Sequence, residues 1–243
     1  MNICVITQAR FGSSRLRGKI LETIDGIPLL KVHLDNAKKS LYSTKFIVAI
    51  ANEPEASIVA NIAAQAGWEF YIGSKDNVLE RFYYAAKNGS ADVVIRLTSD
   101  CPFVQPDLMD ELIKVFKIKK MDYIATSLNF PDGVDVEIFS FRILKEAFEK
   151  AKKISDKEHV TPWITRNAEK ILYWEPNDNK FKDIRLTVDE PEDLKAVNIL
   201  AQKLGVSASY KDYCQYIINT SNEFFNQRIL RNEGYQISIK NEE

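Results

Sequence analysis

Four cations and no acid occupy the stretch "ARFGSSRLRGK", residues 9–19, which directly follows a short apolar run. In open α/β sheets, ligands bind beyond the carboxyl ends of the strands, and a glycine-containing turn there exposes backbone N–H groups to phosphate oxygens. A helix N-terminus that follows adds positive potential. The alternative is a solvated basic loop. Four cations without an acid in that position favour phosphate binding, with charge-assisted hydrogen bonds from Arg10, Arg15 and Lys19.

The spacing of this loop excludes two established nucleotide-binding motifs. Five residues separate Gly12 from Gly18, whereas a P-loop has four at that point. Ile20 also stands where the P-loop has a serine or threonine for magnesium. The Gly-x-Gly-x-x-Gly pattern of dinucleotide-binding proteins is absent from the sequence. The loop therefore predicts a phosphate site of a different kind.

Two aspartates each follow an apolar run and precede a proline. Asp100 lies in "RLTSDCP" and Asp189 in "RLTVDEP". Helix capping is the alternative for both, since a helix is expected from Pro106 and another from Pro191. The likeness of the two segments predicts that both aspartates lie at the same edge of the sheet. Two carboxylates that face a basic loop suit a magnesium–triphosphate complex, in which they bind the metal and the cations bind the phosphates.

Three further residues are weaker candidates. Asp135 and Glu137 alternate with apolar residues in "GVDVEIFS", so their side chains share one face of a strand. Spacing alone favours a solvated hairpin face over the wall of a site. His159, in "DKEHVTPWI", is either a packed residue or a substrate contact. Cys101 and His33 are interpreted as structural, because no basic partner for a thiolate is evident and His33 lies within a helical pattern.

Strand-like and helix-like patterns alternate over the first half of the chain, which predicts a mostly parallel α/β sheet with crossover helices. The pattern changes after about residue 121, where two neighbouring strands, a helix, a helical stretch over 157–169 and two more strands are expected. The simplest organisation is a nucleotidyltransferase-sized domain over 1–205 that carries an inserted β-rich region at about 121–175. A C-terminal helix and polar tail over 206–243 complete it. The expected strands are 3–7, 45–51, 68–73, 92–98, 121–128, 133–141, 171–174 and 183–188, and the expected helices are 28–40, 53–67, 76–89, 106–118, 142–153, 191–205 and 211–221.

The composition restricts the class of protein. The chain has 243 residues, 45% of them hydrophobic and 28% charged, with a net charge of −1. This balance does not favour nucleic acid or membrane surfaces as partners. Three widely spaced cysteines without a ligand pattern argue against structural zinc and disulfides, so we expect a cytoplasmic protein. The N-terminal apolar run is too short for a signal peptide, and no run approaches the length of a membrane span.

Taken together, these motifs resemble those of the cytidylyltransferase family. The segments "ARFGSSRLRGKIL", "GSKDNVLERF", "VIRLTSDCP", "GVDVEIFS", "DKEHVTPWI" and "RLTVDEPEDL" occur in the order and spacing of that family. The family includes synthetases of CMP-linked sugar acids, and the chain is most similar to a branch of spore-coat-polysaccharide type. The resemblance covers roughly residues 1–205, and the tail "LRNEGYQ" also fits that branch. Arg17 departs from the family pattern, which usually has proline there.

The resemblance implies a Rossmann-like three-layer fold and the transfer of CMP from CTP, with magnesium, to a small anionic acceptor such as a sugar acid or a phosphorylated molecule. It also implies a homodimer that packs through the inserted β-rich region. Arg10, Lys19 and Asp100 are the implied catalytic residues, and Asp100 and Asp189 the magnesium ligands. The implied nucleotide-binding residues are Ala9, Arg10, Gly12, Ser13, Arg15, Lys19, Arg81, Thr98 and Asp100, and the implied acceptor residues are Asp135, Glu137 and His159.

Two other functions remain open at the level of the sequence. One is a nucleotidyltransferase that uses another nucleoside triphosphate and a sugar phosphate. The other is a binding protein that holds the nucleotide without catalysis. A Rossmann oxidoreductase is disfavoured because the glycine pattern is absent.

Overall fold

Continuous apolar runs form one seven-stranded sheet in the computed structural model, which describes residues 1–12, 15–229 and 231. The strand order is β5-β4-β1-β6-β8-β7-β9, and only β8 runs antiparallel to its neighbours. The strands are β1 (Ile3–Ala9), β4 (Lys45–Ala51), β5 (Glu69–Gly73), β6 (Val93–Thr98), β7 (Tyr123–Thr126), β8 (Glu137–Ser140) and β9 (Ile171–Trp174). A small hairpin, β2 (Thr23–Ile24) and β3 (Ile27–Pro28), stands apart from this sheet.

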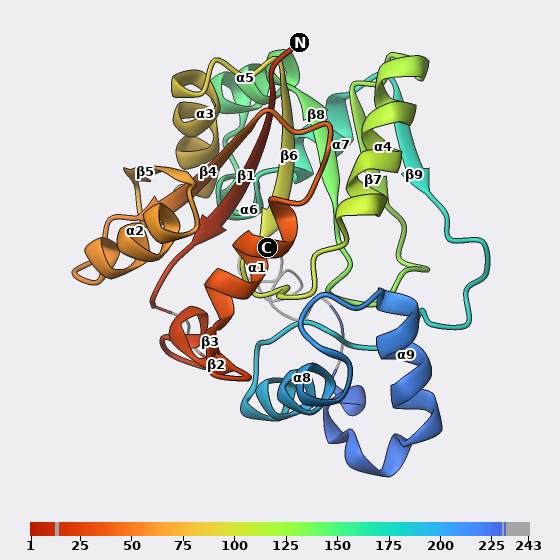
Figure 1. Ribbon diagram of the computed structural model, residues 1–243. Coiled ribbons are helices and arrows are strands. Elements are labelled where there is room, and N and C mark those ends of the chain that lie inside the picture. Colours follow the sequence, from red (N-terminus) through yellow and green to blue (C-terminus); the bar gives the residue numbers. More distant parts are fainter. Residues whose placement is uncertain (13–14, 230, 232–243) are drawn as a thin grey trace.

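Helices cover both faces of the sheet, so the predicted three-layer α/β fold is confirmed (Figure 1). One apolar core joins the sheet to α1 (Leu29–Ala37), α2 (Ala56–Gln65), α4 (Pro106–Lys119), α8 (Pro191–Leu204) and α9 (Tyr210–Asn219). A second core on the other face joins it to α3 (Val78–Asn88), α5 (Phe141–Lys150) and α7 (Pro162–Asn167). The short helix α6 (Ile154–His159) packs on α3. No helix within the described ranges is long and apolar enough to span a bilayer.

The strands expected within the β-rich region, β7, β8 and β9, extend the central sheet beside β6. The helical stretch expected over 157–169 is wrong as one helix, because it is divided between α6 and α7. The backbone of Val160 has a φ of 70° between them, which is outside the helical range, and Pro162 starts the second helix.

The strand expected over 183–188 is also wrong. This segment crosses the end of the sheet and hydrogen-bonds to loops rather than to a strand, through Leu186 N to Asp132 O at 2.7 Å and Val188 N to Asp100 O at 2.9 Å. Its apolar residues alternate because Leu186 and Val188 are buried in the core. A buried irregular segment and a strand can show the same alternation, so the sequence pattern cannot distinguish them.

The chain returns to this end of the sheet after α9. Figure 1 shows α8 and α9 at the lower end of the molecule, toward which β1 and β6 run. Short 3₁₀ helices lie near the same end, namely η1 (Lys19–Leu21), η2 (Ser221–Glu223) and η3 (Phe225–Arg228). The carboxyl ends of β1 and β6 are neighbours, since Gln8 pairs with Thr98. The basic loop and Asp100 therefore begin side by side.

Gly133 allows two loops to approach each other at this edge. Its φ is 96°, and a Cβ atom there would lie 2.6 Å from Thr187 N and 2.7 Å from the carbonyl carbon of Leu186. We expect Gly133→Ala to lower the free energy of unfolding by about 2 kcal/mol or more, because backbone atoms on both sides must shift. Gly26→Ala is the matched control, since Gly26 also has a positive φ of 78° but has no atom within 4 Å of the added Cβ. It should cost only about 1 kcal/mol. Equal losses in urea unfolding would contradict the steric argument.

His33, on α1, holds the turn that follows Asp100. Its Nδ1 donates to the Cys101 carbonyl at 2.8 Å, and burial lowers the pKa of His33 to about 4. Between pH 6.5 and 4 the unfolded chain therefore takes up a proton that the folded protein does not. The free energy of unfolding should fall by up to about 3 kcal/mol over that range from this group alone. His33→Gln, whose amide can donate to the same carbonyl, should show a shallower fall in urea unfolding at several pH values. Parallel curves would refute this origin.

Candidate active site

A cavity of about 890 Å³ opens at the carboxyl edge of the sheet, where the basic loop, the Asp100 turn and the 183–189 segment meet. Almost every predicted site residue within the described part of the chain lines it. The exception is Gly12, and Ser13 lies outside the described residues. The predicted residues that line the cavity are Ala9, Arg10, Arg15, Lys19, Arg81, Thr98, Asp100, Asp135, Glu137, His159 and Asp189.

Lys19 joins Asp100 and Asp189. Its Nζ lies 3.0 Å from Asp100 Oδ2 and 2.8 Å from Asp189 Oδ1, and it also donates to the Val188 carbonyl at 2.9 Å. Burial alone would lower the pKa of Lys19, but the charges of the two carboxylates outweigh burial and raise it. Burial would likewise raise the pKa of Asp100, yet Lys19 holds it well below its usual value. Lys19 and Asp100 are therefore both charged at neutral pH, and the structure brings Asp100 and Asp189 together at the Lys19 ammonium.

Two further cations of the loop also meet acids that the loop itself does not contain. Arg15 Nη2 lies 3.0 Å from Asp189 Oδ1, and its Nε lies 3.6 Å from a Glu190 oxygen. Arg17 is 78% exposed, lies 3.8 Å from Glu55 and 5.5 Å from the centre of the Phe11 ring, and does not line the cavity. Arg10 is exposed and does line the cavity. The loop thus presents Arg10, Arg15 and Lys19 toward the cavity, and the family-atypical Arg17 points elsewhere.

Glu53 is a loop-holding residue that sequence reasoning missed. Its carboxylate accepts hydrogen bonds from the backbone of Phe11 at 2.9 Å and of Gly12 at 3.2 Å, and Lys75 lies 3.3 Å away. A Cβ on Gly12 would lie 2.7 Å from the Glu53 carboxylate. Gly12 therefore serves the close approach of Glu53 to the loop, and its amide points to that acid. The sequence pattern assigns Glu53 only to the start of the helix expected over 53–67, so nothing in the sequence signals this contact.

Arg81, for which the family resemblance implied a nucleotide contact, lines the cavity. The residue is 1% exposed, and its guanidinium donates to the carbonyls of Ser74 at 2.5 Å and Lys75 at 2.8 Å. Its Nε is buried and has no hydrogen-bond partner within the described structure. Burial, followed by the charge of Arg10, lowers the pKa of Arg81 to about 10. Arg81 remains a cation at neutral pH and holds the turn at residues 74–75 through these two hydrogen bonds.

Glu137 belongs to the wall of the cavity, so the solvated hairpin face that spacing favoured is wrong for this residue. Its carboxylate accepts from Tyr123 at 2.5 Å and Thr161 at 2.7 Å and pairs with Arg96. Burial, together with the negative charge of Glu137, raises the pKa of Tyr123 well above its usual value, so the phenol stays protonated and donates. Partners supplied by β6, β7 and the residue before α7 turn this acid inward. Period-two spacing showed which residues share a face but could not show which way that face points.

Asp135 and His159 also line the cavity. Asp135 accepts from Gly133 N at 3.0 Å and from Arg231 at 2.7 Å. Glu175 is a further acid of the cavity wall that the sequence pattern does not indicate. It accepts hydrogen bonds from Ser127 at 2.7 Å and from Asn129 at 2.8 Å. These contacts connect segments far apart in the chain, so only the fold brings them together.

The Cys101 side chain is a buried thiol rather than a nucleophile. Burial, followed by the charge of Asp100, raises its pKa well above its usual value. Its Sγ contacts Thr98 Oγ1 at 3.2 Å and Thr187 Oγ1 at 3.7 Å. It packs the Asp100 turn against the 183–189 segment, in agreement with the structural interpretation.

The fit of a metal ion to the cavity rests on Asp100 and Asp189, which both line it. Within the described ranges, no group of three or more His, Cys, Asp or Glu side chains is arranged to hold one. Asp100 and Asp189 nevertheless converge on one cationic atom, Lys19 Nζ, so their oxygens already face a shared positive charge. Magnesium commonly takes one or two protein carboxylates and completes its shell with water and substrate phosphates. This pair of oxygen donors fits that pattern.

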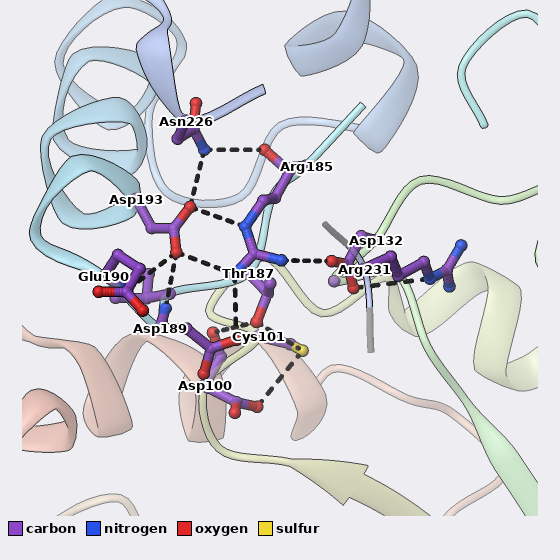
Figure 2. Close-up of polar contacts among 12 residues, drawn as sticks. Asp100, Cys101, Asp132, Arg185, Thr187, Asp189, Glu190, Asp193, Asn226 and Arg231 are labelled. Carbon is purple, nitrogen blue, oxygen red and sulfur yellow. Dashed lines mark hydrogen bonds and ion pairs between the residues drawn. The ribbon is translucent and has the colours of Figure 1, made fainter. Parts of the chain in front are cut away.

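A buried arginine fixes Asp189 from the opposite side. Arg185 Nη2 lies 3.0 Å from Asp189 Oδ2, and the same guanidinium contacts Asp193 and Asp132, as Figure 2 shows. Asp193 in turn accepts from the backbone of Asp189 and Glu190 at 2.9 Å each. One oxygen of Asp189 therefore faces the protein interior, and the other faces Lys19 and the cavity.

Comparisons with known proteins agree with this geometry. The model of the cytidylyltransferase family matches residues 4–215. An uncharacterized protein of Methanocaldococcus jannaschii is 36% identical over 198 residues, which cover 80% of this chain and 81% of that protein. The spore coat polysaccharide biosynthesis protein SpsF of Bacillus subtilis is 31% identical over 221 residues, covering 86% of this chain and 91% of its own length.

A third relative and a solved structure point the same way. A 3-deoxy-manno-octulosonate cytidylyltransferase of Elusimicrobium minutum is 33% identical over 125 residues, about half of either chain (51% and 49%). The structure of a cytidylyltransferase from Leptospira borgpetersenii superimposes with a TM-score of 0.88 at 26% identity, covering 95% of this chain and all (100%) of that one. This chain belongs to the cytidylyltransferase family and is a CTP-dependent nucleotidyltransferase.

Proposed function

We propose that the protein transfers CMP from CTP to a sugar acid or a related small anionic acceptor and releases pyrophosphate, as a step in surface polysaccharide biosynthesis. The observation that carries this proposal is the convergence of Lys19, Asp100 and Asp189 on one edge of a large cavity. The acceptor class is supported by the name of the Elusimicrobium relative, and the pathway by that of the Bacillus relative.

In the proposed reaction, an oxygen of the acceptor forms a bond to the α-phosphorus of CTP. The bond from that phosphorus to the bridging oxygen breaks, and pyrophosphate leaves with the electron pair. A hydroxyl acceptor gives its proton to solvent. Positioning and charge neutralisation supply most of the catalysis in such transfers. Arg10, Arg15 and Lys19 would offset the charge that develops on pyrophosphate.

We further propose that Mg²⁺ binds Asp100 and Asp189 together with the triphosphate. The metal supplies charge neutralisation at the phosphate oxygens. The carboxylate oxygens it would use are those that now hold Lys19. Lys19 would therefore move from the aspartates to the phosphates when the metal complex binds. The homodimer and the cytoplasmic location expected from the sequence stay predictions.

The central residues can be tested in a pyrophosphate-release assay with four nucleoside triphosphates and a panel of acceptors that includes 3-deoxy-manno-octulosonate. CTP should be preferred. Asp100→Ala and Lys19→Ala should each lower kcat/KM by about 10²-fold or more, because each removes charge stabilisation from the transition state.

Asp183→Ala and Lys182→Ala are matched controls, since both residues are exposed and lie outside the cavity. Full activity in the Asp100 and Lys19 variants would refute the assignment of the site. Preference for another triphosphate with a sugar 1-phosphate would favour the alternative transferase. CTP binding without any pyrophosphate would favour a non-catalytic protein.

Metal removal is a separate test of the aspartate pair. EDTA should abolish pyrophosphate release, and Mg²⁺ should restore it. Asp189→Asn should require more Mg²⁺ for its half-maximal rate, because one carboxylate ligand is weakened, whereas Asp183→Asn should match the wild type. Full activity of the chelated enzyme would exclude the proposed metal.

A further inference from the structure

The residues that follow α9 return to the active-site edge, where two side-chain amides, those of Asn226 and Gln227, hold them. Asn226 is fully buried, and its Nδ2 donates to Asp193 Oδ1 at 3.0 Å (Figure 2). The side-chain amide of Gln227 binds the backbone of Arg185 through two hydrogen bonds: its Oε1 accepts from the Arg185 N–H at 2.7 Å, and its Nε2 donates to the Arg185 carbonyl at 3.1 Å. The segment is therefore held by the same cluster that fixes Asp189.

Arg185 connects this cluster to the acceptor side of the cavity. Its side chain is 4% exposed, and its Nη1 lies 2.6 Å from Asp132 Oδ2. Asp132 belongs to residues 128–135, here named the acceptor loop, which joins β7 to β8 and supplies Leu128, Asn129, Asp132 and Asp135 to the cavity wall. One guanidinium thus contacts three carboxylates, those of Asp132, Asp189 and Asp193.

A second arginine, Arg231, binds the acceptor loop from outside the cavity. Its Nη2 donates to Asp135 Oδ1 at 2.7 Å, and its Nε lies 3.7 Å from Asp132 Oδ1. Its Nη1 donates to the carbonyls of Phe130 at 2.8 Å and Leu128 at 3.1 Å. Arg231 does not itself line the cavity. It therefore contacts both acids and two backbone carbonyls of one short loop.

We propose that Arg231 is a positioning residue for the acceptor: it holds the acceptor loop in the shape that binds the acceptor, and the described residues after α9, 220–229 and 231, are thereby part of the active site. This inference rests on the proposed function. Without Arg231, Asp132 and Asp135 would repel each other with only Arg185 to offset them, and the Leu128 and Phe130 carbonyls would lose a donor. Among the described residues, Arg231 makes no hydrogen bond or ion pair with the basic loop or Asp100, which build the proposed nucleotide side of the cavity.

The kinetic test compares Arg231→Gln and Arg231→Lys with the control Arg228→Gln. Arg228 lies in the same segment and is exposed. Arg231→Gln should raise the KM for the acceptor by about tenfold or more, while the KM for CTP changes less than about twofold. Arg231→Lys keeps the charge but not the fork of donors, and should recover part of the loss. A parallel change in both KM values, or no difference from Arg228→Gln, would overturn the proposal.

A second measurement separates this inference from the proposed function. In hydrogen exchange, the amides of the acceptor loop should exchange faster in Arg231→Gln than in the wild type, and those of Arg228→Gln should not. Unchanged exchange would overturn the role of Arg231 whatever the enzyme does. If the wild type releases no pyrophosphate with any acceptor, the proposed function fails, and exchange alone then decides whether Arg231 holds the loop.

Discussion

The hydrogen bond from Val188 N to Asp100 O is the contact on which the site depends. It ties the turn after β6 to a segment some ninety residues further along, and it places Asp189 beside Asp100. Neither aspartate would be near the other through the sheet alone, because the 183–189 segment is not one of its strands. Gly133 serves the same purpose on the next loop, since its missing side chain lets the 186–187 backbone approach. The carboxylate pair is therefore a product of loop packing at the end of a rigid sheet.

Two arginines and one lysine neutralise the acids that this packing gathers. Arg185 is nearly inaccessible and contacts three carboxylates, while Arg231 and Lys19 each contact two. Removing one partner from such a cluster is costly, because a buried carboxylate is left without a counter-charge. Asp193 illustrates the coupling: burial would raise its pKa, but the hydrogen bonds from Arg185 lower it. The geometry of Asp189 is thus set by Arg185, which lines the cavity, and by Asp193, which does not.

How much of this could be predicted from the sequence depends on the range of the interactions. The parallel fold and the positions of Lys19 and Asp100 at the carboxyl edge follow from the order of strands and loops. The sequence predicts Asp189 at the same edge as the end of a strand, but loop packing places it there instead. The roles of Glu53 and Arg231 could not be predicted, since they rest on contacts with residues 40 or more positions away. Arg185 could not either, because it joins Asp189 and Asp193 to Asp132, which is 53 positions away in the chain. The alternating apolar residues over 183–188 correctly indicate which side chains are buried. They do not show which backbone the segment hydrogen-bonds to, so the strand expected there is wrong. The inward direction of Glu137 likewise follows from Arg96, Tyr123 and Thr161, which adjoin it only in the folded chain.

The two sides of the cavity differ in how firmly their charges are held. Around the acceptor loop, Asp132 and Arg185 are mostly buried, and Arg231 also lies close to Asp132, so an incoming group cannot easily displace them. On the basic loop, Arg15 is one-third exposed and Arg10 is exposed, while Lys19 is held by the two carboxylates that suit a metal. A triphosphate alone would have to compete with those carboxylates for Lys19. A triphosphate that arrived with a divalent cation would exchange partners instead: the carboxylates would gain the metal as they lost the ammonium, and no charge would be left unpaired. With the proposed metal site, the arrangement of Lys19, Asp100 and Asp189 would therefore favour the metal complex of the nucleotide over the free nucleotide as the species that binds.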